Sequence, residues 1–344
     1  MNRALLLGVA AMLLVLAALR LAGDLDYWRR YTAALGGIKA EQAPALALPR
    51  LPIAGEPAGL ARATPEAENL LPAALEQARA EAVQRELQAL VVHRHGHRVF
   101  EYFGTGRSGD SMVDGGELAA LPFALALGVL ADNGRATFDA ALQAVHAAMP
   151  PPHGWGNPWS GAARARFALH LAPPLLLQDA DGDVPTTLSQ RVWLPLRAGP
   201  ASLWGRDDTA LRVDCCLAAR LDDWMRLGDL LLGQGRYEGE RIASPDWMRK
   251  LLPADANGRV QPVWLAQQMP WQGDEPPVAR DAYWFDLGTD LRLWLVPRRG
   301  IAVLVWARRS GARDTLIPNI ILRGLNDQAP PVGGSGLNEL VPGH

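Results

Sequence analysis

Residues 87–104 read LQALVVHRHGHRVFEYFG, two apolar runs that meet at a single glycine. Valine, leucine, phenylalanine and tyrosine are frequent in these runs, and such residues favour strands. Gly96 permits the tight turn that an antiparallel pair needs between its strands. The stretch is therefore predicted to form a strand hairpin near the start of the folded part of the chain.

A second hairpin is predicted near the other end of the chain. Residues 290–309 read DLRLWLVPRRGIAVLVWARR, with an apolar run on each side of Pro-Arg-Arg-Gly. Between the hairpins, residues 113–134 and 215–233 are predicted to be helices, and residues 145–210 are irregular and rich in proline, glycine and tryptophan. A last helix is predicted near 314–325. These patterns predict an α+β fold: an antiparallel sheet from both ends of the chain, flanking helices and a mainly helical inserted region.

The bulk composition narrows the function classes. The chain has 344 residues, a formal net charge of −2 and 49% hydrophobic residues, so it can bury a large core. No basic run marks a nucleic-acid surface, and nucleic-acid binding is not expected. The cysteines Cys215 and Cys216 are adjacent, which excludes both a disulfide framework and Cys-x-x-Cys metal spacing. No cofactor is predicted.

The first 23 residues, MNRALLLGVAAMLLVLAALRLAG, are predicted to be a membrane anchor or a signal segment. No clear Ala-x-Ala cleavage site and no cysteine for lipid attachment follow, which favours an uncleaved single span over residues 4–22 in a bacterial inner membrane. Arg29 and Arg30 after the span outnumber Arg3 before it, so charge alone does not set the orientation. Because long domains translocate largely regardless of such charges, we expect the domain in the periplasm.

The remaining boundaries follow from composition. Residues 24–75 are rich in alanine and proline without a sustained period, and are predicted to be a linker. Residues 76–325 are predicted to form the folded domain. Residues 326–344 are predicted to be a loose C-terminal tail.

Three histidines in the first hairpin raise the question of a metal site. His93, His95 and His97 alternate, and alternate residues of one strand share a face. Gly96 lies inside the triplet, however, so the chain is expected to reverse there without the three rings converging. We predict an exposed turn and no metal. The stretch DADGD at 179–183 is likewise predicted to be a turn, because its glycine is misplaced for a calcium loop.

Five segments, in the same order and with similar spacing, resemble parts of the serine beta-lactamase-like hydrolases. That group comprises class C beta-lactamases, penicillin-binding proteins and 6-aminohexanoate-dimer hydrolases. The resemblance covers roughly residues 75–325 and implies a beta-lactamase/transpeptidase-like fold. The segments are LVVHRHGHRVFEYFGTG (90–106), GVLADNGR (128–135), VWLPL (192–196), CCLAARLDDWMRLGDLLLGQGRYEGERIASPDWM (215–248), which is the most specific, and LRLWLVPRRGIAVLVWAR (291–308).

The resemblance implies three catalytic parts. A serine at a helix N-terminus is deprotonated by a lysine one turn later, hence the spacing Ser-x-x-Lys. A tyrosine from the helical region relays the proton to the leaving group. A glycine motif with lysine or histidine, on a strand near the C-terminus, lines the pocket, and the backbone of that strand helps to form the oxyanion site.

The first part is missing from this sequence. Counting back from Gly128 and Gly134 with the family's spacing, the serine position falls on Glu117 and the lysine position on Ala120. No Ser-x-x-Lys occurs anywhere in the chain. In a helix that starts at Glu117, Pro122 is expected to remove a backbone hydrogen bond and to kink the site. A carboxylate without a base or an oxyanion partner is a poor acyl acceptor.

The other two parts depart from the pattern as well. No tyrosine occurs between Tyr102 and Tyr237. Before the last hairpin, only a glycine and a threonine of the C-terminal motif remain, out of register, and they are followed by an aspartate. We therefore predict a remnant cleft lined by Glu117, Gly288, Thr289 and Asp290.

Three functions are compatible with these observations. The favoured one is a membrane-anchored homologue that has lost catalysis and binds a peptide, a cell-wall fragment or a protein partner. The second is an active serine hydrolase of ester, amide or peptide bonds with a rearranged nucleophile. The third is a scaffold that assembles through its membrane span. The second function would use Ser108, Ser111 or Ser160 as nucleophile and His153 or His170 as base.

Overall fold

The computed structural model describes residues 12–14, 50–134, 183–204, 217–255, 259–260, 271, 273–287, 291–307 and 314–326. The chain divides into two units, Met1–Pro49 and Arg50–His344. In the first unit, the described residues 12–14 are helical, and the rest of the expected span lies outside the described residues. No helix in the described part of the chain is long and apolar enough to cross a membrane.

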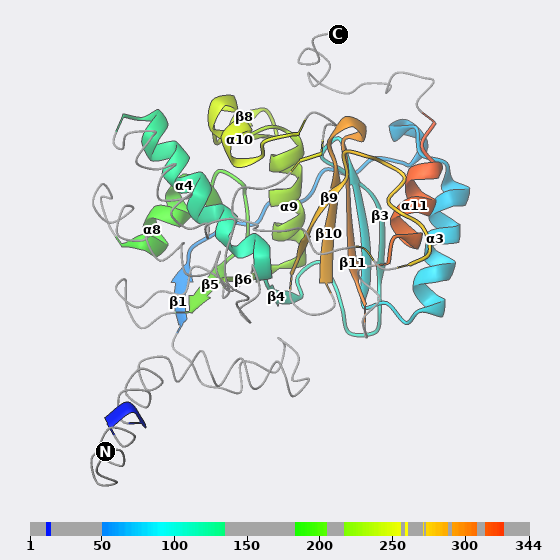
Figure 1. Cartoon of the computed structure of the whole chain (residues 1–344), viewed down its shortest axis with the longest axis horizontal. Helices are drawn as coiled ribbons and strands as arrows, with labels where there is room; N and C mark the ends of the chain where they lie inside the picture. Colours follow the sequence, from blue (N-terminus) through cyan, green and yellow to red (C-terminus); the bar gives the residue numbers. More distant parts are fainter. Residues whose placement is uncertain are drawn as a thin grey trace, which may run out of the picture. The chain divides into compact units, whose positions relative to one another are not determined.

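A five-stranded antiparallel sheet forms the centre of the second unit (Figure 1). Its strand order is β3-β2-β11-β10-β9, and β2 pairs with β11 so that Ala89 lies opposite Trp306. The two predicted hairpins are therefore neighbours, which confirms that both ends of the chain build one sheet. The strands are β2 (Ala89–Arg94), β3 (His97–Phe103), β9 (Tyr283–Asp286), β10 (Leu291–Val296) and β11 (Ile301–Trp306).

Helices cover both faces of this sheet. Alternate residues of β11 point to opposite faces, and both sets are buried. Ile301, Val303 and Val305 belong to the core under α3 (Pro72–Gln84) and α11 (Leu316–Arg323), and the intervening residues of β11 belong to the core under α9 (Leu221–Leu232). The three layers are visible in Figure 1, with the sheet between α9 and the pair α3 and α11.

A second, four-stranded antiparallel sheet corrects two predictions. Its order is β1-β5-β6-β4, with β1 (Arg50–Ile53), β5 (Ala201–Trp204), β6 (Leu217–Arg220) and β4 (Met112–Asp114). The folded unit thus begins at Arg50, inside the segment expected to be a linker, and the inserted region contributes strands as well as α8 (Val184–Leu188). β1 escapes sequence analysis because only Ile53 of its four residues is buried, and its partner strand is distant in sequence.

The predicted helix at Glu117 also differs from the observed structure. A 3-10 helix, η3 (Gly116–Ala120), is followed directly by α4 (Leu121–Asp132). Pro122 therefore stands in the first turn of α4, where its missing N–H would have had no helical partner. For this reason, the prediction that Pro122 kinks the helix was wrong. The region 215–233 likewise begins as β6 before α9 starts.

Gly128 of α4 permits close packing against α10 (Pro245–Leu251). Trp247 of α10 is fully buried, and its indole Nε1 donates to the carbonyl oxygen of Ala124 at 2.9 Å. A Cβ atom at Gly128 would lie 2.3 Å from Cδ1 of that indole. The position therefore requires glycine, although glycine is a poor residue for a helix interior.

Gly128→Ala is expected to lower the free energy of unfolding by about 1–3 kcal/mol, because overpacking against Trp247 outweighs the helix propensity of alanine. Urea denaturation followed by circular dichroism measures the change. Gly59→Ala is the matched control, since no atom lies within 4 Å of a Cβ built there. A Gly128→Ala variant at least as stable as the unaltered protein would contradict the packing described.

Candidate functional site

The residues at the predicted serine and lysine positions lie on η3. Glu117 is the second residue of this 3-10 helix and Ala120 is the fifth. Residues three apart eclipse each other in a 3-10 helix, so the two positions share one face, as a serine and its lysine would. Beside η3 lies β9, the edge strand of the central sheet. Gly288, Thr289 and Asp290 of the predicted cleft follow β9 and lie outside the described residues.

The start of η3 is fixed by contacts with α9 and β6. The amide of Gly115 donates to the carbonyl oxygen of Leu217 at 2.8 Å, and the amide of Gly116 donates to Oδ1 of Asp114 at 2.9 Å. A Cβ atom at Gly115 would lie 2.2 Å from Cη2 of Trp224 on α9. The backbone at the helix start is thus held against the indole of α9, and only glycine fits there.

Two of the three alternative serines belong to a loop turn. The hydroxyl oxygen of Ser108 accepts a hydrogen bond from the amide of Asp110 at 3.2 Å. The hydroxyl oxygen of Ser111 accepts a hydrogen bond from the amide of Ser108 at 3.1 Å. In the described part of the chain, neither hydroxyl contacts a histidine, lysine or carboxylate. Both serines therefore have the contacts of turn-stabilising residues. Ser160, His153 and His170 lie outside the described residues.

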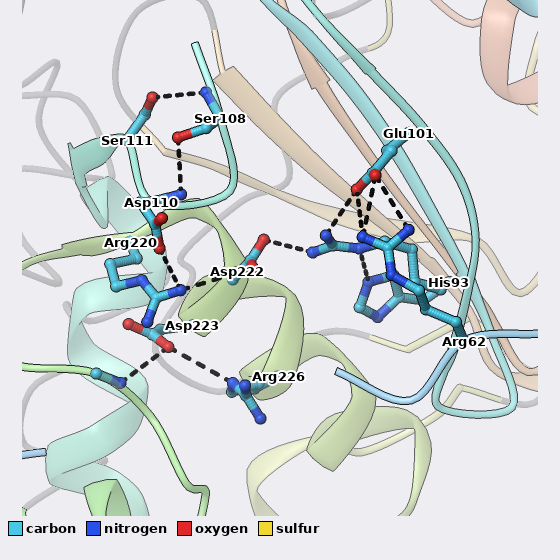
Figure 2. A network of polar contacts seen from close by, with 12 residues as sticks. Arg62, His93, Glu101, Ser108, Asp110, Ser111, Arg220, Asp222, Asp223 and Arg226 are labelled. Carbon is cyan, nitrogen blue, oxygen red and sulfur yellow. Dashed lines mark hydrogen bonds and ion pairs between the residues drawn. The ribbon is translucent and has the colours of Figure 1, made fainter. Parts of the chain in front are cut away.

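A row of alternating charges joins this loop to the central sheet (Figure 2). Asp110 contacts Arg220 at 2.5 Å, and Arg220 lies 3.7 Å from Asp222 on α9. Asp222 also pairs with Arg98 of β3, which pairs at 2.7 Å with Glu101. Arg62 then binds Glu101 at 3.0 Å. We call the six residues the charge network: Arg62, Arg98, Glu101, Asp110, Arg220 and Asp222.

His93 lies beside the charge network and is fully buried, so the prediction that it belongs to an exposed turn was wrong. Its Nδ1 lies 2.8 Å from Oδ2 of Asp229 on α9, and its Nε2 accepts a hydrogen bond from Nε of Arg98 at 3.4 Å. Because Nε2 faces a donor, Nδ1 carries the hydrogen and donates to the carboxylate. The ring therefore holds β2 to α9.

The other two histidines contact a different residue, so the three rings do not converge on one point, as predicted. His95 and His97 both contact the carboxylate of Glu68, at 2.7 and 2.8 Å. His93 lies on β2, His95 in the turn and His97 at the start of β3, so the triplet does not lie along one strand. Within the described ranges, no group of three ligand-type residues is placed to hold a metal ion.

α9 also carries a buried pair of oppositely charged residues, Asp223 and Arg226. Asp223 is fully buried, and its Oδ1 accepts the amide of Gly199 at 3.1 Å and lies 3.5 Å from Nε of Arg226. Burial raises the pKa of the Asp223 carboxyl. Arg226 donates to the hydroxyl of Tyr237 at 2.7 Å and to the carbonyl oxygen of Ala58. Burial likewise raises the pKa of the Tyr237 hydroxyl.

Arg98→Met is expected to lower the free energy of unfolding by about 2–4 kcal/mol, because Asp222 and His93 then lose a buried partner. Arg249→Met is the matched control. Arg249 pairs with Asp246 between side chains 68% and 72% exposed, so its loss is expected to change stability by less than about 0.5 kcal/mol. Equal losses in the two variants, measured by urea denaturation, would contradict a structural role of the charge network.

Comparisons with known proteins address the fold. No protein-family model matches this sequence, and no curated protein matches it. A structure named as a candidate 6-aminohexanoate-dimer hydrolase from Bacillus anthracis is similar with a TM-score of 0.55 and 12% identity, over 81% of this chain and 89% of that chain. At this identity the likeness concerns the fold alone.

Two further structures are similar at lower scores. One is named as a candidate beta-lactamase from Bacteroides dorei DSM 17855, with a TM-score of 0.47, 13% identity, and 72% and 96% of the two chains covered. The other is a penicillin-binding protein homologue from Caulobacter crescentus, with a TM-score of 0.48, 12% identity, and 77% and 97% covered. With its central antiparallel sheet and flanking helices, the chain has the beta-lactamase/transpeptidase-like fold of the serine beta-lactamase-like hydrolases.

Proposed function

We propose that this protein is a beta-lactamase-like hydrolase homologue that has lost catalysis and acts as a binding or scaffolding protein in the cell envelope. One observation carries the proposal. Glu117 and Ala120, which the spacing of the family puts at the serine and lysine positions, lie on η3. The helix start is present, and the two side chains that the chemistry requires are replaced.

The missing groups are hard to supply from elsewhere in the chain. A serine nucleophile needs a base within hydrogen-bond reach, and an alanine side chain offers none. The chain has two lysines, Lys39 and Lys250. Lys250 is exposed on α10, and Lys39 lies outside the described residues. The lack of a tyrosine between residues 102 and 237 also removes the usual proton relay.

The alternative is an active serine hydrolase with a rearranged nucleophile. The hydroxyls of Ser108 and Ser111 accept backbone amides of their own loop, which argues against either as nucleophile. Ser160 with His153 or His170 stays a prediction. This alternative is weaker, because a nucleophile and its base must lie within hydrogen-bond reach and no such pair is found among the described serines.

The proposal extends to location and ligand. The apolar sequence of residues 4–22 supports an anchor in a bacterial inner membrane, with the domain in the periplasm. A peptide, a cell-wall fragment or a protein partner is the proposed ligand of the remnant cleft.

We expect the purified full-length protein to remain unlabelled by a fluorescent penicillin and by a fluorophosphonate, and to hydrolyse a model ester no faster than buffer. The reason is that neither an activated serine nor a lysine base stands on η3. Gel fluorescence and absorbance measure labelling and turnover, with an active serine beta-lactamase as positive control. The Glu117→Ser variant is expected to stay unlabelled, since Ala120 supplies no base.

Labelling or turnover that disappears on one serine substitution, tested with Ser108→Ala, Ser111→Ala and Ser160→Ala in turn, would overturn the loss of catalysis. It would establish the rearranged nucleophile instead.

A separate experiment tests the anchor. The full-length protein is expected to remain in the membrane fraction after alkaline carbonate washing, and a variant lacking residues 1–23 is expected to be released, because the apolar segment is gone. A fusion of alkaline phosphatase after residue 40 reports the orientation and is expected to be active in the periplasm. Release of the full-length protein by the carbonate wash, or proteolytic maturation after residue 22, would contradict the proposed membrane anchor.

A further inference from the structure

One carboxylate is held between two imidazole rings at the end of the first hairpin. Glu68 belongs to the 3-10 helix η2 (Glu66–Glu68), His95 to the β2–β3 turn and His97 to the start of β3. Nδ1 of His95 lies 2.7 Å from one oxygen of Glu68, and Nδ1 of His97 lies 2.8 Å from the other. We call these three residues the clamp.

The protonation pattern of the clamp follows from its geometry. A charged carboxylate only accepts hydrogen bonds, so Nδ1 of each ring carries a hydrogen, and in each neutral ring Nε2 is the free acceptor. The side chain of Glu68 is 7% exposed, whereas those of His95 and His97 are 23% and 34% exposed. Protons from solvent therefore reach the rings more readily than the carboxylate.

The backbone fixes the ring of His95 in this position. His95 has a φ of 49°, in the left-handed region, and its amide donates to the carbonyl oxygen of Gly300 at 2.8 Å. A Cβ atom at Gly300 would lie 2.4 Å from Cδ2 of the ring. The ring thus lies against a glycine, in a turn whose conformation is set by the facing hairpin.

The clamp joins three parts of the chain. Next to Glu68, the carbonyl oxygen of Asn69 accepts the amide of Asn326 at 2.9 Å, and the amide of Leu71 donates to the carbonyl oxygen of Gly324 at 2.9 Å. Gly324 directly follows α11, and Leu71 directly precedes α3. The clamp therefore holds the start of α3 and the end of α11 to the β2–β3 turn.

The charges around the clamp are mostly positive. Arg94 of β2 interacts electrostatically with Glu68 and with Arg299, which follows β10. Glu66 lies on the same 3-10 helix as Glu68, and Arg323 at the end of α11 pairs with Glu275. Burial raises the pKa of Glu68. The hydrogen bonds and charges of the two histidines lower this pKa by more than burial raises it, so the net pKa lies below the ordinary value. Glu68 is therefore the charged acceptor of the clamp.

We propose that the clamp is a pH-responsive latch, which tightens in mild acid and fixes the start of α3 and the end of α11 to the β2–β3 turn. When a ring takes a proton from solvent at Nε2, its Nδ1–H bond to Glu68 changes from a neutral donor to an imidazolium paired with a carboxylate. Such charge-assisted bonds are shorter and roughly twice as strong. Histidine makes this change between about pH 8 and pH 5.

Hydrogen exchange of the full-length protein tests the latch, with the amides of Leu71 and Asn326 as local probes. After correction for the intrinsic exchange rate, their protection factors are expected to rise about fivefold for each ring protonated between about pH 7.5 and pH 5.5. Below the ordinary pKa of glutamate, the protection is expected to fall again as Glu68 takes a proton, because a carboxyl whose pKa is lowered by folding loses its stabilising contribution in acid.

The matched variant is His95→Asn with His97→Asn. Asparagine places a donor near the position of Nδ1, tolerates the left-handed backbone at position 95, and does not titrate. Its protection factors are expected to be constant between about pH 7.5 and pH 5.5. Glu68→Gln, which keeps an acceptor but not the charge, is expected to remove most of the rise.

Three results would overturn the proposal. They are unchanged or falling protection in the unaltered protein, an equal rise in the asparagine variant, and a neutral tautomer with hydrogen on Nε2 in nitrogen-15 spectra of the rings. The third measurement needs no substitution, so it remains decisive if the variants fail to fold.

Discussion

The structure depends on a helix that buries its charges instead of exposing them. Four charged residues of α9 each contact a different part of the chain. Asp222 contacts the strand β3, and Asp229 contacts the strand β2. Asp223 contacts the loop before β5, and Arg226 contacts both the segment after β1 and the strand β7 (Arg236–Tyr237). Removing one partner of such a buried pair leaves the other charge buried without compensation. Each contact therefore constrains the position of its segment strongly. The two sheets are thereby held to one helix, and the start of η3 is placed against the same helix through Gly115 and Trp224.

The contacts that place the start of η3 belong to the fold itself. The backbone at Gly115 and Gly116 is held by Trp224, Leu217 and Asp114. These contacts precede Glu117 and Ala120 in the chain. The fold therefore does not by itself indicate which chemistry the site performs.

The candidate site rests on spacing along the chain and stays a prediction. The positions of Glu117 and Ala120 follow from counting residues, and the structure places both on η3. The role of Ser108 and Ser111 was not predictable, because a glycine-rich loop before a helix is compatible with either a nucleophile or a turn. The contacts of His95 and His97 with Glu68 left no local signal either, since the glutamate lies on η2, well before the hairpin in the sequence.

The sequence alone established the central sheet, because apolar runs on either side of a turn are a local signal and two hairpins at opposite ends of the chain leave few ways to pair. It also shows that no Ser-x-x-Lys occurs in the chain, since this requires only the order of the residues. Tertiary packing determined the rest. β1 is a strand because β5 pairs with it. Pro122 lies in the first turn of α4, because the preceding turn is the separate 3-10 helix η3. Asp223 and Asp229 of α9 are buried beside the amide of Gly199 and the ring of His93, which come from distant segments, and no local pattern encodes such partners.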